Sequence, residues 1–268
     1  MWINLLINKI KERLRLRSII EGKTVKLRLL DLSEKLIDDV KLLDIGCSDG
    51  KFTIEFSKKV GAKKVYGLEI DKYLIREARS KGIICKKSDA NKKLPFRDNF
   101  FDVIICNQVV EHLYDPDNLF QEINRILKMN GYLYISTPNL CSLHGRIFVL
   151  LGWQPTAISP STRFIFGNPL RGETSGFCKY NRHLTCFTPA SFKEMTEFYG
   201  FKIIKYSGSV IYPFGSKISD SISRFFPSLS VYQIIKARKI RHIQPKKINL
   251  ELLKKNINYE KKFPLIKN

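Results

Sequence analysis

Five short runs of apolar residues recur through the first half of this 268-residue chain, and the segments between them show helical periodicity. The runs lie at residues 41–45, 64–69, 82–85, 101–107 and 131–136. Because they are apolar throughout rather than alternating, they are typical of parallel strands covered on both faces. Strands that alternate with helices in this way predict a doubly wound, mostly parallel α/β sheet with right-handed crossovers.

Two later runs, at residues 201–206 and 231–235, extend the predicted sheet to seven strands, with a short helix near residues 217–225. Polar residues that can cap a helix precede four helical segments, and proline follows two of them at the first helical position. These helix starts are Asp49, Asp71, Asp115-Pro116 and Thr188-Pro189. Gly131 and Gly200 are expected to end the last two of these helices.

Breaks in this rhythm divide the chain into five predicted parts. Residues 140–187 hold prolines, glycines and aromatic residues with little periodicity, which is typical of an inserted lid or substrate-binding segment. The five parts are an N-terminal basic amphipathic helical segment at 1–40, a ligand-binding core at 41–139, the inserted segment at 140–187, a return to the core sheet at 188–237 and a basic C-terminal tail at 238–268.

The net charge of +22 is concentrated near the C-terminus, where residues 211–268 carry 13 Lys and Arg against 3 Asp and Glu. Such a tail can bind nucleic acid, an anionic membrane or an acidic glycan, or it can be solvated without a partner. Residues 3–14 form an apolar helical face among basic residues, which fits either a helix on an anionic membrane or a cap over the core. No run approaches the roughly 18 apolar residues of a membrane span, so the expected location is cytoplasmic, with peripheral membrane contact as an option.

The segment Leu42-Leu43-Asp44-Ile45-Gly46-Cys47-Ser48-Asp49-Gly50 joins the first strand to the first helix, where doubly wound folds bind ligands. A dinucleotide-binding loop would read G-x-G-x-x-G, but Ser48 replaces its second glycine and no third glycine follows. Asp44 and Asp49 would each oppose a pyrophosphate by roughly 3 kcal/mol at ~5 Å and an effective dielectric of ~20. They would attract the sulfonium and ammonium groups of S-adenosylmethionine, although Asp49 alone is explained equally well as a helix cap.

Carboxylates also follow the next two predicted strands. Glu69 lies about 20 residues past the glycine loop, where an acid can accept both hydrogen bonds of an adenosine ribose diol. Asp71 is more simply a helix cap. Asp89 can accept from an adenine amino group, with Ala90 leaving room for the ring, or it can be an ordinary turn aspartate.

In series, these motifs resemble those of the class I S-adenosylmethionine-dependent methyltransferases, most of all the methyltransferase type 11 branch with the ubiquinone-type O-methyltransferases. The resembling segments are 44–50, Glu69, Asp89, 94–96, 101–107, Glu111-His112-Leu113 and 131–139. The resemblance covers roughly residues 40–140, resumes over 183–204, and departs at Ser48, where glycine is usual. Residues 139–169 also resemble methyltransferases encoded with cell-surface polysaccharide genes.

The resemblance implies a Rossmann-like fold, S-adenosyl-L-methionine as cofactor and a set of cofactor contacts. Asp44 and Gly46 would lie by the methionine moiety, Glu69 on the ribose and Asp89 at the adenine. Asn107 and Gln108 would line the space beside the sulfonium and the acceptor. The full implied cofactor set is Asp44, Gly46, Cys47, Ser48, Gly50, Glu69, Ile70, Asp89, Ala90, Asn107 and Gln108.

Methyl transfer to a hydroxyl needs a base, whereas transfer to a neutral amine or a carbanion need not. His112, just after the fourth strand, is the predicted catalytic base, although a helix-start histidine bonded to the backbone is an equally good interpretation. His183 is a second candidate from the inserted segment. No metal site is predicted, because the candidate zinc ligands are irregularly spaced and split between two distant segments. Those ligands are Cys141, His144, Cys178, His183 and Cys186.

The sequence therefore predicts an enzyme that methylates a small-molecule, lipid or sugar-linked acceptor, with oxygen as the favoured acceptor atom. The alternative, suggested by the basic termini, is an RNA- or membrane-binding protein with a non-catalytic methyltransferase core. RNA methylation is disfavoured because Asn107-Gln108-Val109-Val110 stands where an Asn/Asp-Pro-Pro-Tyr-like tetrapeptide would follow the fourth strand. The six cysteines include no C-x-x-C pair, so reduced structural thiols are expected.

Overall fold

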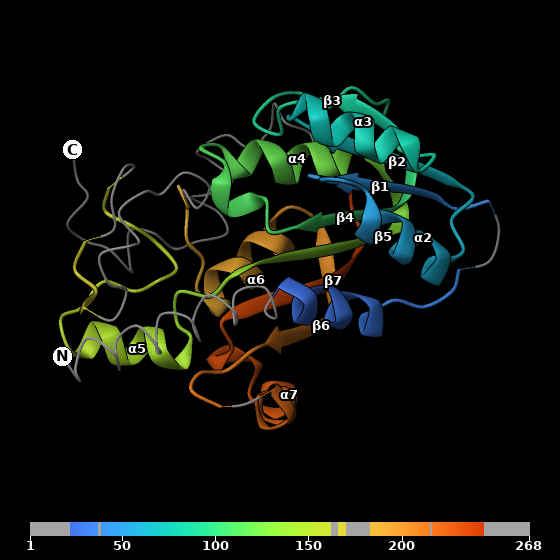
Figure 1. Cartoon of the computed structure of the whole chain (residues 1–268). Coiled ribbons are helices and arrows are strands. Elements are labelled where there is room, and N and C mark those ends of the chain that lie inside the picture. The colour runs from blue at the N-terminus through green and yellow to red at the C-terminus, as the bar shows by residue number, and fades with distance from the viewer. Residues whose placement is uncertain (1–21, 37–38, 162–165, 170–182, 215, 244–268) are drawn as a thin grey trace.

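The computed structural model describes residues 22–36, 39–161, 166–169, 183–214 and 216–243 (Figure 1). Seven strands form one sheet in the order β3-β2-β1-β4-β5-β7-β6. Neighbouring strands from β3 to β5 are parallel, and β7 runs antiparallel between β5 and β6. The strands are β1 (Lys41–Ile45), β2 (Lys64–Glu69), β3 (Ile84–Lys87), β4 (Phe101–Asn107), β5 (Leu127–Pro138), β6 (Phe201–Ser209) and β7 (Tyr232–Lys239). This arrangement confirms the predicted doubly wound, mostly parallel sheet.

Helices cover both faces of the sheet (Figure 1). They comprise a helix at residues 22–32, α2 (Lys51–Val60), α3 (Lys72–Ser80), η1 (Val110–His112), α4 (Pro116–Ile126), α5 (Leu143–Leu150), α6 (Pro189–Phe198), α7 (Ser216–Phe225) and η4 (Pro227–Leu229). Buried residues of α4 and α6 join one apolar cluster, and those of α2 and the helix at 22–32 join another. The helix at 22–32 therefore forms part of the cover over the core, whereas residues 1–21 lie outside the described part of the chain.

Alternate residues of β1 face opposite layers, as strand geometry requires. Leu43 and Ile45 pack into the cluster beneath α4 and α6, whereas Leu42 packs beneath α2. Each such fully buried aliphatic side chain contributes roughly 1.5–3 kcal/mol to the free energy of unfolding. Asp44 shares the α2 side and bonds to Thr53 of that helix. A carboxyl group thus lies among the apolar residues of the buried part of this strand.

Three of the four predicted helix caps are confirmed, since Asp71, Asp115 and Thr188 all accept hydrogen bonds from backbone amides of the helices that follow. The prediction that Asp49 caps the remaining one of these helices, α2, is wrong. The N-cap is Gly50, with φ of 77°, and Asp49 accepts instead from the Lys51 amide at 3.1 Å. Left-handed backbone at Gly50 starts the helix one residue later than the aspartate would.

Gly131 does not end a helix, which corrects a second prediction. α4 stops at Ile126, and the next residue already belongs to the twelve-residue strand β5. Gly131 lies inside that strand, where a Cβ would come within 2.9 Å of the Asp102 carbonyl oxygen and the Leu127 side chain. Close strand and helix packing, rather than helix termination, explains this glycine.

The last strand extends two residues into the predicted tail and ends at Lys239. The ammonium group of Lys239 is buried and donates to the carbonyl of Leu127 at 2.7 Å. Burial lowers the pKa of Lys239 to about 8. Lys239 also donates to the carbonyl of Asn124. A lysine usually marks an exposed position, so the sequence did not predict that the strand continues to this residue. The predicted tail from residue 244 onward, like Cys178, lies outside the described residues.

Within the described residues, no helix combines the length and the apolar character that crossing a bilayer would require.

Candidate active site

The loop after β1 is held against β2 by backbone hydrogen bonds. The amides of Gly46 and Cys47 both donate to the Leu68 carbonyl, at 2.8 and 3.0 Å. Gly46, Ser48 and Gly50 have φ angles of 76°, 51° and 77°, so the loop turns through three residues in the left-handed region. A Cβ on Gly46 would lie 2.5 Å from Cγ2 of Val109, which directly follows the turn after β4. The β1 loop and the β4 turn therefore meet at the carboxyl end of the sheet.

Glu69 ends β2, and its carboxylate collects three backbone amides. The Ser48 amide donates to Oε2 at 3.0 Å, and those of Ile70 and Asp71 donate to Oε1 at 2.7 and 3.1 Å. These bonds fix the β1 loop to the start of α3. A carboxylate offers about four lone-pair directions, so acceptor capacity remains for a diol. Beside it, the Ile70 side chain is 61% exposed and offers an apolar surface at the same edge.

Asp44 lies beneath the glycine loop with only 3% of its surface exposed. Thr53 Oγ1 donates to its Oδ2 at 2.6 Å. Burial raises the pKa of Asp44 to about 7, against the Thr53 hydrogen bond and the ammonium of Lys26, while the nearby Glu69 adds to the rise. The carboxyl is thus poised to ionise near neutral pH when a cation approaches.

Asp49 shows the opposite behaviour in the same loop. Burial raises its pKa, but the Lys51 amide and the Lys51 ammonium, 3.0 Å from Oδ2, outweigh that effect and leave the pKa below its ordinary value. Its charge is therefore already neutralised within the chain. Of the two loop aspartates, Asp44 is the one whose charge is free to respond to a ligand.

Two residues of the predicted cofactor set, Cys47 and Asp89, have side chains that contact other parts of the chain. Cys47 is buried, with its Sγ 3.6 Å from the Cys85 Sγ, so its backbone rather than its thiol faces the loop surface. Asp89 accepts from the Asn91 amide at 2.9 Å and from the Asn91 side chain at 3.0 Å, as in an ordinary Asx turn. Ala90 is partly buried against the core cluster.

Asn107 and Gln108 leave β4 beside Ser136 of β5. Ser136 Oγ donates to Asn107 Oδ1 at 2.7 Å. Gln108 has φ of 56°, and the amide orientation that satisfies both ends accepts from the Thr137 amide and donates to Glu111 Oε1 at 3.3 Å. The polar side chains after β4 therefore form one network that leads to Glu111.

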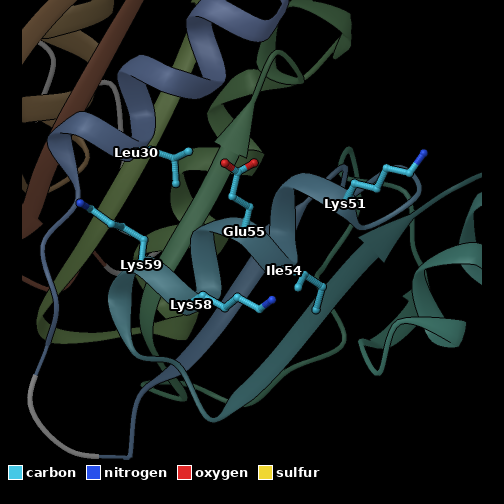
Figure 2. A pocket seen from close by; sticks show the side chains of 6 residues that line it. All are labelled: Leu30, Lys51, Ile54, Glu55, Lys58 and Lys59. Carbon is cyan, nitrogen blue, oxygen red and sulfur yellow. The ribbon is translucent and has the colours of Figure 1, made fainter.

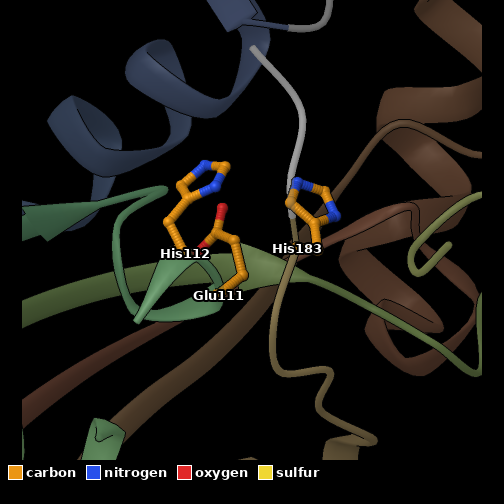
Figure 3. Close-up of side chains that lie close together, drawn as sticks. All are labelled: Glu111, His112 and His183. Carbon is orange, nitrogen blue, oxygen red and sulfur yellow. The ribbon is translucent and has the colours of Figure 1, made fainter. Parts of the chain in front are cut away.

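Glu111, His112 and His183 lie together beyond the end of β4 (Figure 3). The imidazole centroids of His112 and His183 are 5.1 Å apart. Glu111 is 1% exposed, and burial raises its pKa to about 8, against hydrogen bonds from its own amide and Thr137. The amides of Leu184 and Thr185 donate to the Glu111 carbonyl at 2.7 and 3.1 Å, which places His183 beside His112.

Sequence reasoning named both histidines but did not select Glu111 as a site residue. The available signal was an acid directly after an apolar strand and next to a histidine. Thr53, the hydrogen-bond donor to Asp44, was also missed, because a threonine inside an amphipathic helix carries no comparable signal.

A hollow of about 540 Å³ lies away from this edge, along the outer side of α2 (Figure 2). Its lining residues are Leu30, Lys51, Ile54, Glu55, Lys58 and Lys59. None of them belongs to the predicted site. Three lysines against one glutamate make it a basic, solvent-facing depression rather than a cofactor pocket.

A family model for a methyltransferase domain matches residues 16–206. The chain is 30% identical to a ubiquinone biosynthesis O-methyltransferase of Pelagibacter ubique over 164 residues, or 57% of this chain and 66% of that protein. It is 31% identical to a demethylmenaquinone methyltransferase of Lactobacillus johnsonii, over 60% and 67% of the two chains. An uncharacterized methyltransferase of Schizosaccharomyces pombe is 35% identical, over 38% and 41% of the two chains.

These matches span between about two fifths and two thirds of each relative's length. Among solved structures, an S-adenosylmethionine-dependent methyltransferase of Thermotoga maritima superposes with a TM-score of 0.53 at 17% identity, covering 88% of this chain and all of that one. One from Methanosarcina mazei superposes with a TM-score of 0.55 at 21% identity, covering 76% and 94%. The sheet order, the glycine loop and the family match agree: the chain belongs to the methyltransferase domain family and has the fold of the class I S-adenosylmethionine-dependent methyltransferases.

Proposed function

We propose that this protein transfers a methyl group from S-adenosylmethionine to an oxygen of a small-molecule, lipid or sugar-linked acceptor. The observation that carries the proposal is the buried Asp44 carboxyl beneath the glycine loop, with its pKa near 7 and Lys26 as an opposing charge. A ligand that brings positive charge to this point would stabilise the ionised carboxylate. A pyrophosphate is negatively charged and would instead disfavour the ionised carboxylate.

The residues at the carboxyl end of the sheet fit the rest of the cofactor. Glu69 retains lone pairs for a ribose diol, and Ile70 beside it offers an exposed apolar surface to a purine. Asn107 and Gln108 lie between this edge and the Glu111–His112 turn. When bound, S-adenosylmethionine supplies an electrophilic methyl group on its sulfonium sulfur. The chain contributes alignment of that methyl with the acceptor atom, which is the dominant source of rate in such a displacement.

Oxygen is the proposed acceptor atom for two reasons: the name of one relative, and the position of the His112 side chain. The Pelagibacter relative is named as an O-methyltransferase, and 57% of this chain aligns with it. His112 lies just beyond the Asn107–Gln108 turn, half-buried, where it can accept the proton of an acceptor hydroxyl. The described part of the inserted segment contributes His183 to the same place, which supports a role for residues 140–187 in holding the acceptor.

Methyl transfer is tested by incubating the purified chain with S-[methyl-¹³C]adenosylmethionine and an extract of polar metabolites and lipids. We expect a new methoxy carbon resonance in the products, because oxygen-, nitrogen- and carbon-bound methyl groups have distinct shifts. Label that appears on nitrogen or carbon would contradict O-methylation while leaving the methyltransferase assignment intact.

The Glu69→Gln variant should lose both label transfer and most of its affinity for the cofactor, by about tenfold or more in calorimetry. The loss has two sources, since a charged acceptor of ribose hydrogen bonds is removed and the β1 loop is released. Glu55→Gln on the exposed face of α2 is the matched control and should bind like the wild type. Equal losses in both variants would contradict the assignment of Glu69.

The alternative is an RNA- or membrane-binding protein with a non-catalytic core, and it predicts that the basic tail is responsible for this binding. Ile243 is the last described residue, and its amide donates to Asn124 at 3.0 Å, so a truncation should begin at residue 244. We expect the chain of residues 1–243 to keep cofactor affinity and label transfer within about twofold, because the tail lies beyond β7. Cofactor binding without label transfer in the full-length chain, together with RNA or anionic-vesicle binding that residues 1–243 lack, would favour the alternative.

A further inference from the structure

Glu111, His112 and His183 each direct one potential ligand atom into a common small volume, and these atoms all lie within 4.8 Å of one another (Figure 3). Two imidazole nitrogens and one carboxylate oxygen form the ligand set of catalytic zinc sites and of other sites with an open coordination position. We propose that these three side chains bind a divalent transition-metal ion such as Zn²⁺. This metal site goes beyond the proposed methyl transfer, which does not itself require a metal.

His183 is prepared to act as a ligand by its hydrogen bond to the chain. Its Nδ1 lies 2.7 Å from the Ala157 carbonyl oxygen, which can only accept. Nδ1 therefore carries the hydrogen in this bond, and in the neutral ring Nε2 keeps its lone pair. Metal-ligating histidines usually make such a bond through the second ring nitrogen, because it fixes the tautomer and the ring orientation.

Glu111 is oriented in the same manner. Thr137 Oγ1 donates to its Oε2 at 3.2 Å, and the Gln108 amide donates to its Oε1 at 3.3 Å. In the described part of the chain, no Lys or Arg forms a salt bridge with this carboxylate, although the side chain is almost fully buried. A buried carboxylate is costly without a compensating charge, and a divalent cation would supply one.

Backbone bonds bring the three ligands together from distant parts of the chain. The amides of Leu184 and Thr185 both donate to the carbonyl of Glu111, and Thr185 Oγ1 donates to the Val110 carbonyl at 3.2 Å. His183 is therefore attached to the same turn that carries His112. Around a tetrahedral zinc with bonds of about 2.0–2.1 Å, ligand atoms lie roughly 3.3 Å apart. The three ligand atoms lie within 4.8 Å of one another, so small side-chain rotations are enough to bring them onto one ion.

The ligand chemistry selects the class of metal and affects the proposed mechanism. Mg²⁺ and Ca²⁺ prefer oxygen ligands, whereas imidazole suits zinc and other transition metals. An imidazole lone pair that binds a cation cannot also take a proton, so His112 cannot be the base while it is a ligand. In that state a hydroxyl at the open position would have its pKa lowered by the metal instead, a consequence that rests on the proposed methyl transfer.

The test is a titration of the tag-free full-length chain with Co²⁺ after chelator treatment, followed by visible absorption. We expect one Co²⁺ per chain with the intense d–d bands of four- or five-coordinate cobalt, and displacement of that signal by Zn²⁺. His183→Ala should weaken metal affinity by at least about tenfold, since even loss of an outer partner costs about 10–100-fold. His242→Ala is the matched control, because this histidine is exposed and lies near Asp98. Asp98 precedes the start of β4, whereas the proposed metal ligands lie beyond its other end.

Cofactor affinity measured on the same samples separates this proposal from the proposed function. His183→Ala should bind S-adenosylmethionine like the wild type, because no predicted cofactor contact involves it, and this also shows that the variant is folded. Absence of a cobalt signal in the wild type, or equal affinity in wild type and His183→Ala, would overturn the metal site. Absence of cofactor binding in the wild type would instead overturn the proposed function and leave the metal result standing.

Discussion

Replacing Asp44 with asparagine is expected to stabilise the protein above about pH 7. The folded pKa of Asp44 is raised from 3.8 to about 7, so the contribution of the protonated carboxyl to stability is fully present below about pH 3.8 and is lost as pH rises from 3.8 to about 7. Three pKa units correspond to about 4 kcal/mol. Asparagine stays neutral and can still accept the Thr53 hydrogen bond, so Asp44→Asn should unfold at higher urea concentration than the wild type at about pH 9 and similarly to it below about pH 4, with the difference growing between these values.

The same substitution should remove most of the affinity for S-adenosylmethionine. A cationic ligand favours the ionised carboxylate, so wild-type affinity should fall as pH drops below about 7, with proton release on binding. Calorimetry in buffers of different ionisation enthalpy measures that release, which Asp44→Asn should abolish. Asp49→Asn is the matched control, because the pKa of Asp49 lies below its ordinary value and its substitution should give no gain at high pH. Pronounced stabilisation by Asp49→Asn would contradict the account.

Gly46→Ala is expected to destabilise the protein by about 2–5 kcal/mol and to lower cofactor affinity. Two costs add here. An alanine in the left-handed region costs about 1–2 kcal/mol, and the new Cβ, 2.5 Å from the Val109 side chain, costs about 1–3 kcal/mol as overpacking. Urea unfolding and calorimetry measure the two effects.

Val109→Ala should recover part of that loss, because it removes the methyl group that the new Cβ would meet. The double variant Gly46→Ala/Val109→Ala should therefore be more stable than the sum of the single changes, by about 0.5 kcal/mol or more. Gly82→Ala isolates the backbone cost, since Gly82 has φ of 83° and nothing lies within 4 Å of its added Cβ. Additive behaviour of the double variant would show that the two residues do not collide.

The central strands were predictable because their signal is local. β1, β2 and β4 begin and end where the apolar runs do, since parallel strands buried on both faces tolerate few polar residues. The strands β3 and β7 were displaced or cut short, because β3 ends in lysines at the exposed edge and β7 holds Lys236 and Lys239. Their charges find partners only in the folded chain, as the carbonyls around Lys239 show.

Part of the arrangement of the candidate site residues was also predictable. The glycine loop and Glu69 are recognisable from spacing alone, and the structure brings them into contact through the Ser48 amide. The proximity of Glu111 and His183 was not predictable from the sequence, because 71 residues lie between them. Their proximity depends on two hydrogen bonds, from the backbone amides of Leu184 and Thr185 to the Glu111 carbonyl. Nor does spacing reveal that Asp44 is buried, which is the property that sets its pKa.

The inserted segment leaves and rejoins the sheet at adjacent points. Asn139 forms a parallel bridge with Phe187, the Leu140 amide donates to the Phe187 carbonyl at 3.1 Å, and Gln233 of β7 donates to the carbonyls of both Pro138 and Phe187. These contacts hold the two ends of the segment side by side at the sheet. The length of the segment can change at a cost that grows only logarithmically with the number of residues. Under the proposed function, in which this segment holds the acceptor, a change of segment would alter acceptor preference and leave the sheet and the glycine loop unchanged.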